Sequence, residues 1–168
     1  PGQPVKQPMV IPLRTALFDR ATGQHGGEHL LVLTQAEETF TFDGFTAPPV
    51  LSINRGFSAP VEVTAPVSAD DLVFLAAHDD DPFARYEAMQ QLIVRHLVAA
   101  VAGNLPDAER AAGRAAIGNA MGAILDDAAL DDLMRGELLI LPGEAYLAEQ
   151  LDRADPTRIF AEREGLKR

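Results

Sequence analysis

The sequence predicts a small, immunoglobulin-like β-sandwich followed by an all-α helical array that begins an α-superhelix. Up to Pro66, apolar residues alternate at period two between turns rich in glycine and proline, as in short β-strands. Beyond Pro66 they recur every three or four positions, as in amphipathic helices. The acidic excess also grows, from four basic and six acidic residues over 1–66 to ten basic and nineteen acidic over 67–168. We therefore place a β-sandwich domain at 1–66 and a superhelical-repeat-like helical domain, truncated at its C-terminus, at 67–168.

The composition excludes several classes of protein. Apolar residues make up 47% of the 168 residues, which is typical of a globular protein. The net charge of −11 disfavours binding to nucleic acid, because an acidic surface repels phosphates. The chain has no cysteine, so disulfides, cysteine-ligated zinc and a thiol nucleophile are excluded. No apolar run reaches the length of a membrane span, and we expect a cytoplasmic segment cut from a longer protein.

The β unit is expected to contain about five short strands. Pro8 and Pro12 argue that the first is an edge strand or enters the sheet obliquely. Glycines mark a turn over 19–27, and Asp43-Gly44 marks another. The pair Phe40 and Phe42 alternates with threonine and is expected to point into the core. The predicted strands cover 9–17, 30–33, 39–42, 50–53 and 57–63.

Sixty-six residues make a thin sandwich, since an immunoglobulin-like domain usually takes about 100. Either the β unit is stabilised by packing against the helical unit, or the strands that would complete it precede Pro1. The junction has almost no linker, so we expect a packed interface over 57–83 and a single cooperative unfolding transition.

The helical unit is expected to contain six helices. Ser68, with Asp71 three residues later, predicts a capped start for the first, which runs to about His78. Asp81-Pro82 starts the second, and Gly103 ends it. Its buried stripe is predicted to be Phe83, Tyr86, Met89, Ile93, Leu97 and Val101. The remaining helices are predicted at 107–125, 127–141, 144–151 and from 156 onward, the third weakened by Gly113, Gly118 and Gly122.

One motif resembles a metal site. His25-Gly-Gly-Glu28-His29 matches H-x-x-E-H, an inverted zinc-peptidase signature that needs a helix to bring both imidazoles to one metal. The two glycines inside it favour a polar hairpin loop instead, and no third ligand is evident. A small metallopeptidase built on His25, Glu28 and His29 therefore remains only a rival hypothesis.

The other polar groups have simpler interpretations. The run from His78 to Asp81 is read as a helix end, a solvated turn and the cap of the next helix. The doublets Asp126-Asp127 and Asp131-Asp132 are read as helix starts, since neighbouring helical residues diverge by about 100°. His96 is expected to be packed or half-exposed, and Ser58 lacks the setting of a nucleophile. We assign no catalytic, cofactor-binding or metal residue to this chain.

Four ordered blocks resemble the bacterial aminopeptidase N family, a group of zinc-dependent alanyl aminopeptidases. They are KQPMVIPLRTALFD (Lys6–Asp19), LTQAEETFTFDGF (Leu33–Phe45), NRGFSAPVEV (Asn54–Val63) and LVFLAAHDDDPFARYEAMQQL (Leu72–Leu92). The resemblance places the chain at the family's small β-sandwich and the start of its helical superhelix. It implies that the zinc motif H-E-x-x-H, the G-x-M-E-N motif and the catalytic tyrosine belong to a preceding domain. Gly118-Asn119-Ala120-Met121 is not that second motif.

The resemblance implies a non-catalytic segment of an enzyme that removes N-terminal residues from peptides. The sandwich would be a spacer, and the helices would wall the substrate chamber. The segment would pack on the missing catalytic and C-terminal helical domains, with zinc held elsewhere in the longer enzyme. The alternative is an independent module that binds peptides or proteins and has no enzymatic role. In both readings we expect no nucleic acid or membrane partner.

Overall fold

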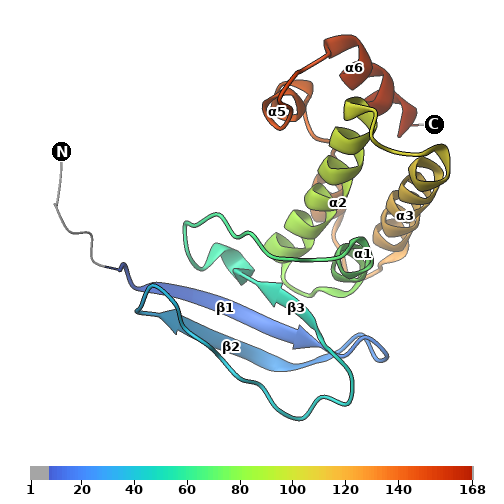
Figure 1. Ribbon diagram of the computed structural model, residues 1–168. Coiled ribbons are helices and arrows are strands. Elements are labelled where there is room, and N and C mark those ends of the chain that lie inside the picture. The colour runs from blue at the N-terminus through green and yellow to red at the C-terminus, as the bar shows by residue number, and fades with distance from the viewer. Residues whose placement is uncertain (1–7, 168) are drawn as a thin grey trace, which may run out of the picture. The chain divides into compact units, whose positions relative to one another are not determined.

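The computed structural model describes residues 8–167 and divides into two compact units, 1–66 and 67–168 (Figure 1). Residues 1–7 and 168, which include the first residues of the Lys6–Asp19 block, lie outside the described residues. No described helix is both long and apolar enough to cross a bilayer.

The first unit is built on a three-stranded antiparallel sheet in the order β2-β1-β3 (Figure 1). Its strands are β1 (Ile11–Phe18), β2 (His25–Leu33) and β3 (Val50–Ile53). β1 is the central strand, so the prediction of an edge strand from its prolines is wrong. The physical reason is register: β3 pairs only with Thr15–Phe18, and Pro12 lies beyond the part of β1 that has a neighbour on both sides.

Two of the five expected strands are not formed. Residues 39–42 lie outside any helix or strand, and the 57–63 stretch begins with a short 3-10 turn at Arg55–Phe57. The predicted turn over 19–27 is also shorter, because β2 already starts at His25. The Asp19 carboxylate holds that turn by accepting hydrogen bonds from the N–H groups of Ala21 and Thr22.

The core of the first unit lies mainly on β1 and its neighbours. Its buried apolar residues include Leu13, Ala16, Leu17, Phe18, Val50 and Ala59. Phe40 is 38% exposed and Phe42 only half-buried, so the expectation that this pair points into the core is wrong. Both phenylalanines follow the last residue of β2, on a segment that pairs with no described strand.

The second unit begins with the two best-predicted helices. α1 (Ala69–His78) starts with a complete capping box, in which Ser68 accepts from the N–H of Asp71 and Asp71 accepts from that of Ser68. α2 (Pro82–Ala102) starts at the Asp81 cap and ends at Gly103, whose φ of 76° is left-handed. These boundaries confirm the cap signals in the sequence.

Four further helices complete the described part of the unit: α3 (Asp107–Asp126), α4 (Asp132–Leu138), α5 (Glu144–Glu149) and α6 (Pro156–Gly165). α4 is shorter than the predicted 127–141, because residues 127–131 form a turn and Asp131 caps the helix through the N–H of Met134. α2 packs against each of the other five helices. Its Met89, Ile93, Leu97 and Val101 are at most 4% exposed, which confirms the main part of the predicted stripe.

Two glycine-to-alanine substitutions should change stability in opposite directions. Gly103→Ala puts a side chain at a left-handed φ and places Cβ 3.3 Å from the Arg158 guanidinium, so we expect a loss of about 1 kcal/mol. Gly118→Ala, inside α3 with no atom within 4 Å of the new Cβ, should instead gain up to about 1 kcal/mol. Urea unfolding of both variants measures the two signs, and equal signs would contradict this account.

Candidate functional site

The structure separates the three residues of the H-x-x-E-H motif. They lie on strand β2, so the hairpin-loop interpretation is wrong as well as the helical one. The His25 ring packs 4.8 Å from the Phe18 ring, and the His29 ring packs 4.9 Å from that of Phe42. Among the described residues, no three His, Asp or Glu side chains are grouped closely enough to hold a metal.

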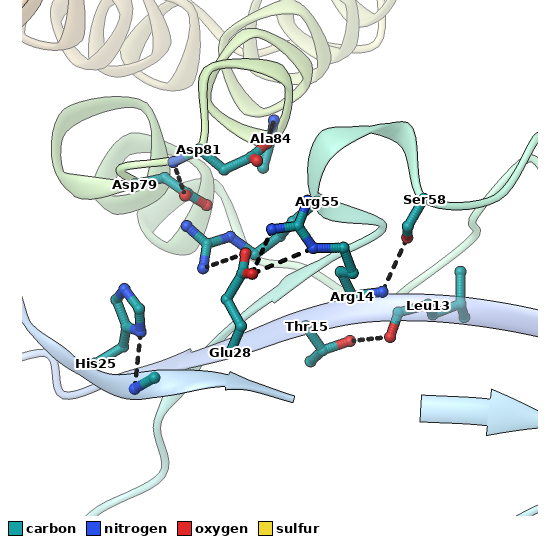
Figure 2. A network of polar contacts seen from close by, with 11 residues as sticks. Leu13, Arg14, Thr15, His25, Glu28, Arg55, Ser58, Asp79, Asp81 and Ala84 are labelled. Carbon is teal, nitrogen blue, oxygen red and sulfur yellow. Dashed lines mark hydrogen bonds and ion pairs between the residues drawn. The ribbon is translucent and has the colours of Figure 1, made fainter. Parts of the chain in front are cut away.

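Glu28 instead joins two arginines of the first unit (Figure 2). Its Oε2 accepts from the Nη2 of Arg14 on the paired strand β1, and its Oε1 lies 3.2 Å from Nη1 of Arg55. The Arg55 side chain is 2% exposed and its guanidinium lies 5.9 Å from the centre of the Phe18 ring. A carboxylate and an aromatic face therefore both offset the burial of this arginine.

Arg55 belongs to a tightly turned segment over 54–59. Asn54 and Phe57 have left-handed φ values of 58° and 51°, and Gly56 between them has 60°. The Asn54 amide stabilises this backbone: its Nδ2 donates to the Ala59 carbonyl at 3.1 Å, and its Oδ1 accepts from the Ala59 N–H at 2.9 Å. Ser58 adds a link to the sheet, since its Oγ accepts from the N–H of Arg14 at 2.8 Å.

The sequence pattern does not reveal this cluster, because it predicts a strand from Phe57 onward and marks NRGFSAPVEV only within the resemblance. The available signal was the pair Asn54 and Gly56, two residue types that tolerate left-handed backbone and therefore mark a turn.

Substitutions of Asn54 should separate its backbone role from its side-chain role. Asn54→Gly keeps the left-handed φ without strain but loses the hydrogen bonds of the amide, two with the Ala59 backbone and one from the Ser58 hydroxyl, so we expect a loss of about 1–2 kcal/mol. Asn54→Ala loses the same bonds and adds strain at φ 58°, for a total loss of about 2–4 kcal/mol. Thermal unfolding of the two variants compares them. An alanine variant as stable as the glycine variant would show that the backbone is not strained at this position.

In the second unit, the acidic residues after His78 form the tight connection between α1 and α2. Asp79 is 1% exposed, so the expectation of a solvated turn is wrong at this residue. Its Oδ1 accepts from the N–H of Asp81, whose own carboxylate accepts from the N–H of Ala84 and caps α2 (Figure 2). The acidic residues are thus arranged to hold backbone N–H groups at the start of a helix.

Arg85 of α2 stabilises the same connection between α1 and α2. It is 6% exposed, and it donates to the carbonyls of Ala76 and Ala77 at the end of α1, through Nε at 2.7 Å and Nη2 at 3.2 Å. Its Nη1 donates to Asp127 Oδ2 at 2.8 Å. This hydrogen bond lowers the pKa of Asp127 below its ordinary value. Asp127 therefore follows the last residue of α3 and binds Arg85. The prediction that the doublet Asp126-Asp127 starts a helix is wrong.

His96 is the most enclosed histidine of the second unit. It lies on α2, is 8% exposed, and its Nε2 has no hydrogen-bond partner among the described residues. Gly113 on α3 makes room for the ring, because a Cβ there would lie 2.4 Å from Nδ1. Of the three glycines on α3, Gly113 permits this close approach, whereas a Cβ at Gly118 or Gly122 would meet no atom within 4 Å.

Charged groups from two other helices surround His96. Arg110 and Arg114 of α3 donate to Glu162 of α6, Arg110 Nη1 at 2.5 Å and Arg114 Nη2 at 3.2 Å. Burial, with Arg114 and Arg110 nearby, lowers the pKa of His96, and Glu162 opposes this shift. The imidazole is therefore held in its neutral form more strongly than in an unfolded chain.

The helical unit should lose stability in mild acid through His96. Because the folded pKa lies below the unfolded value near 6.5, the unfolded chain binds the proton first and stability falls as pH drops below about 6.5. One such group contributes at most about 1.4 kcal/mol per pH unit. Urea unfolding from pH 7.5 to 5.5 should show this loss in the wild type and a smaller one in His96→Gln. Parallel pH profiles of the two proteins would rule His96 out as the cause.

Comparisons with known proteins cover both units. Residues 69–168 match a family model described as "Domain of unknown function (DUF3458_C) ARM repeats", and residues 1–66 match one described as DUF3458 with an Ig-like fold. Aminopeptidase N of Escherichia coli strain K12 is 33% identical over 175 residues, a match that covers 100% of this chain and 20% of that protein. Aminopeptidase N of Caulobacter vibrioides is 37% identical over 138 residues, covering 82% of this chain and 16% of that protein.

The chain belongs to the DUF3458_C family, its first unit matches the DUF3458 model, and the whole chain is homologous to a segment of bacterial aminopeptidases N. A solved structure agrees: Legionella pneumophila aminopeptidase A, crystallised with aspartic acid, is 28% identical with a TM-score of 0.77, over 94% of this chain and 18% of that one. The predicted fold class, an Ig-like domain followed by a helical repeat domain, is confirmed by the two family models. The chain spans about a fifth of the length of these relatives.

Proposed function

We propose that this chain is a non-catalytic segment of a zinc-dependent aminopeptidase that removes N-terminal residues from peptides. The observation that carries the proposal is the match to aminopeptidase N along the whole chain but over only a fifth of the relative's length. The zinc and the catalytic groups would lie in the remaining polypeptide. Peptides would therefore be partners of the longer enzyme.

The two units would have different mechanical roles. The sheet and the 54–59 segment make the first unit a spacer of fixed shape, supported by the buried Arg55 and the bonded Asn54. The helical unit would form part of the wall of a substrate chamber. ARM-type repeats suit this role, because stacked helices make extended curved surfaces.

The test of the assignment compares the longer natural polypeptide with residues 1–168 alone. We expect the longer protein to bind zinc and hydrolyse alanine and leucine anilides, and the isolated segment to do neither. His25→Ala with His29→Ala is the decisive variant of the segment, and His78→Ala, which changes an exposed histidine, is its control. Stoichiometric zinc in the segment that is lost only in the His25/His29 variant would refute the proposal.

The chamber role is tested by substrate length. If helices wall off the site, kcat/KM of the longer enzyme should fall by at least about tenfold between short peptides and chains of some twenty residues that share the same first residues. An equal kcat/KM across the series would argue against a restricted chamber.

A further inference from the structure

Helix α6 buries little apolar surface against the rest of the helical unit. Its 10 residues include one that is buried, Ile159, at 2% exposure. Polar contacts add to this anchor: Arg158 donates from Nη2 to the Ala100 carbonyl of α2 at 3.1 Å, and Arg163 donates from Nε to the Pro142 carbonyl at 2.8 Å. Because a helix of this length is marginal by itself, α6 depends on such polar contacts to stay in place.

The contact between α6 and α3 is centred on Glu162. Its Oε1 accepts from Arg110 Nη1 and its Oε2 from Arg114 Nη2, so both carboxylate oxygens already have partners. The Glu162 side chain is 14% exposed, and the two guanidinium groups offset the burial of its charge. The helices approach closely here, because a Cβ at Gly165 would lie 2.7 Å from Arg114 Nη2. These contacts fix α6 against α3.

His96 of α2 is enclosed next to these charges. Its Nε2 is buried and has no hydrogen-bond partner among the described residues, and a Cβ at Gly113 would lie 2.9 Å from its Cε1. Among the described groups, the charges that shift the pKa of His96 are Arg110 and Arg114 of α3 and Glu162 of α6. None of these charges comes from α1, α4 or α5, the other helices that pack against α2.

A proton on His96 would upset the charge balance of this cluster. With a neutral imidazole, two guanidinium groups face one carboxylate. The Nε groups of Arg110 and Arg114 are themselves buried without an acceptor among the described residues, so donors already exceed acceptors. Protonation adds a third positive charge and a further N–H donor. Because a protein interior screens like charges less than water does, the protonated cluster is relieved by opening toward solvent.

We propose that protonation of His96 releases α6 from α3 without unfolding the rest of the helical unit. The protonated imidazole repels Arg110 and Arg114 and competes with them for Glu162. Since the arginines and the carboxylate lie on different helices, the cluster opens where α3 meets α6. In an array of helical repeats each unit contacts only its neighbours, which keeps such an opening local. The inference does not rest on the proposed function.

Hydrogen exchange of residues 1–168, measured by mass spectrometry, tests the proposal. Each rate is compared with the intrinsic rate at the same pH to give a protection factor. Peptides within α6 should lose about five- to tenfold of their protection between pH 7.5 and pH 5.5, because the lower pH is one unit below the ordinary histidine pKa near 6.5. Protection of α6 that is equal at both pH values would overturn the proposal.

Low concentrations of urea distinguish the release of one helix from unfolding of the whole unit. An opening confined to α6 exposes little surface, so exchange of α6 at pH 5.5 should hardly change on addition of about 1 M urea. Peptides from α1, which open only when the unit unfolds, should exchange faster. An equal response of α6 and α1 to urea would make the acid effect a global loss of stability and would contradict the inference.

Two pairs of variants test the residues. His96→Gln removes the titratable proton and should make α6 protection independent of pH, whereas His78→Gln, at an exposed histidine, should keep the wild-type dependence. Glu162→Gln should lower α6 protection already at pH 7.5, whereas Glu164→Gln, the same change of charge on the same helix, should leave it close to the wild-type value.

Either pair can overturn the proposal by itself. A pH-dependent α6 in His96→Gln would assign the effect to another group. Equal protection of α6 in Glu162→Gln and Glu164→Gln would show that the Glu162 contact does not hold the helix. If His96→Gln does not fold, the two glutamate variants and the urea series of the wild type still decide the question.

Discussion

The buried stripe of α2 is the interaction on which the helical unit depends. Met89, Ile93, Leu97 and Val101 lie along one side of this helix, and α2 packs against every other described helix of the unit. Fully burying each of these side chains stabilises the fold by roughly 1.5–3 kcal/mol. The short helices α4 and α5 each have a single buried residue, Leu138 and Leu147 respectively. These two helices therefore depend on packing against α2. Short helices of this kind are marginal without such packing.

Polar side chains then fix the positions of the helix ends around that stripe. Arg85 binds two carbonyls at the end of α1 and the Asp127 carboxylate, while Arg110 and Arg114 of α3 bind Glu162 of α6. Each arginine connects elements that are distant in sequence. Arginine suits this work because its planar guanidinium carries several donors in a fixed geometry. The neutral, enclosed His96 lies within the second of these groups and makes its packing sensitive to protons.

In the β unit, backbone pairing rather than the side-chain pattern decides which of the predicted strands form. The sequence predicted strands at 9–17, 30–33 and 50–53, and the sheet contains all three, although β2 begins five residues earlier than expected. Residues 39–42 carry an equally clear pattern and remain unpaired among the described residues. A strand forms only when its backbone hydrogen-bonds to a second strand. Periodicity in the sequence therefore identifies a candidate strand but does not identify the strand with which it pairs.

By itself, the sequence determined the fold class, the change from strands to helices after Pro66, and the helix ends marked by Ser68, Asp81 and Gly103. These features are local, because caps, turns and periodicity act over only a few residues. The tertiary structure alone decided that β1 is central, that Glu28 binds arginines rather than a metal, and that Asp127 serves Arg85. The last two outcomes depend on contacts between residues 14 to 42 positions apart, and spacing along the chain does not encode which of them meet.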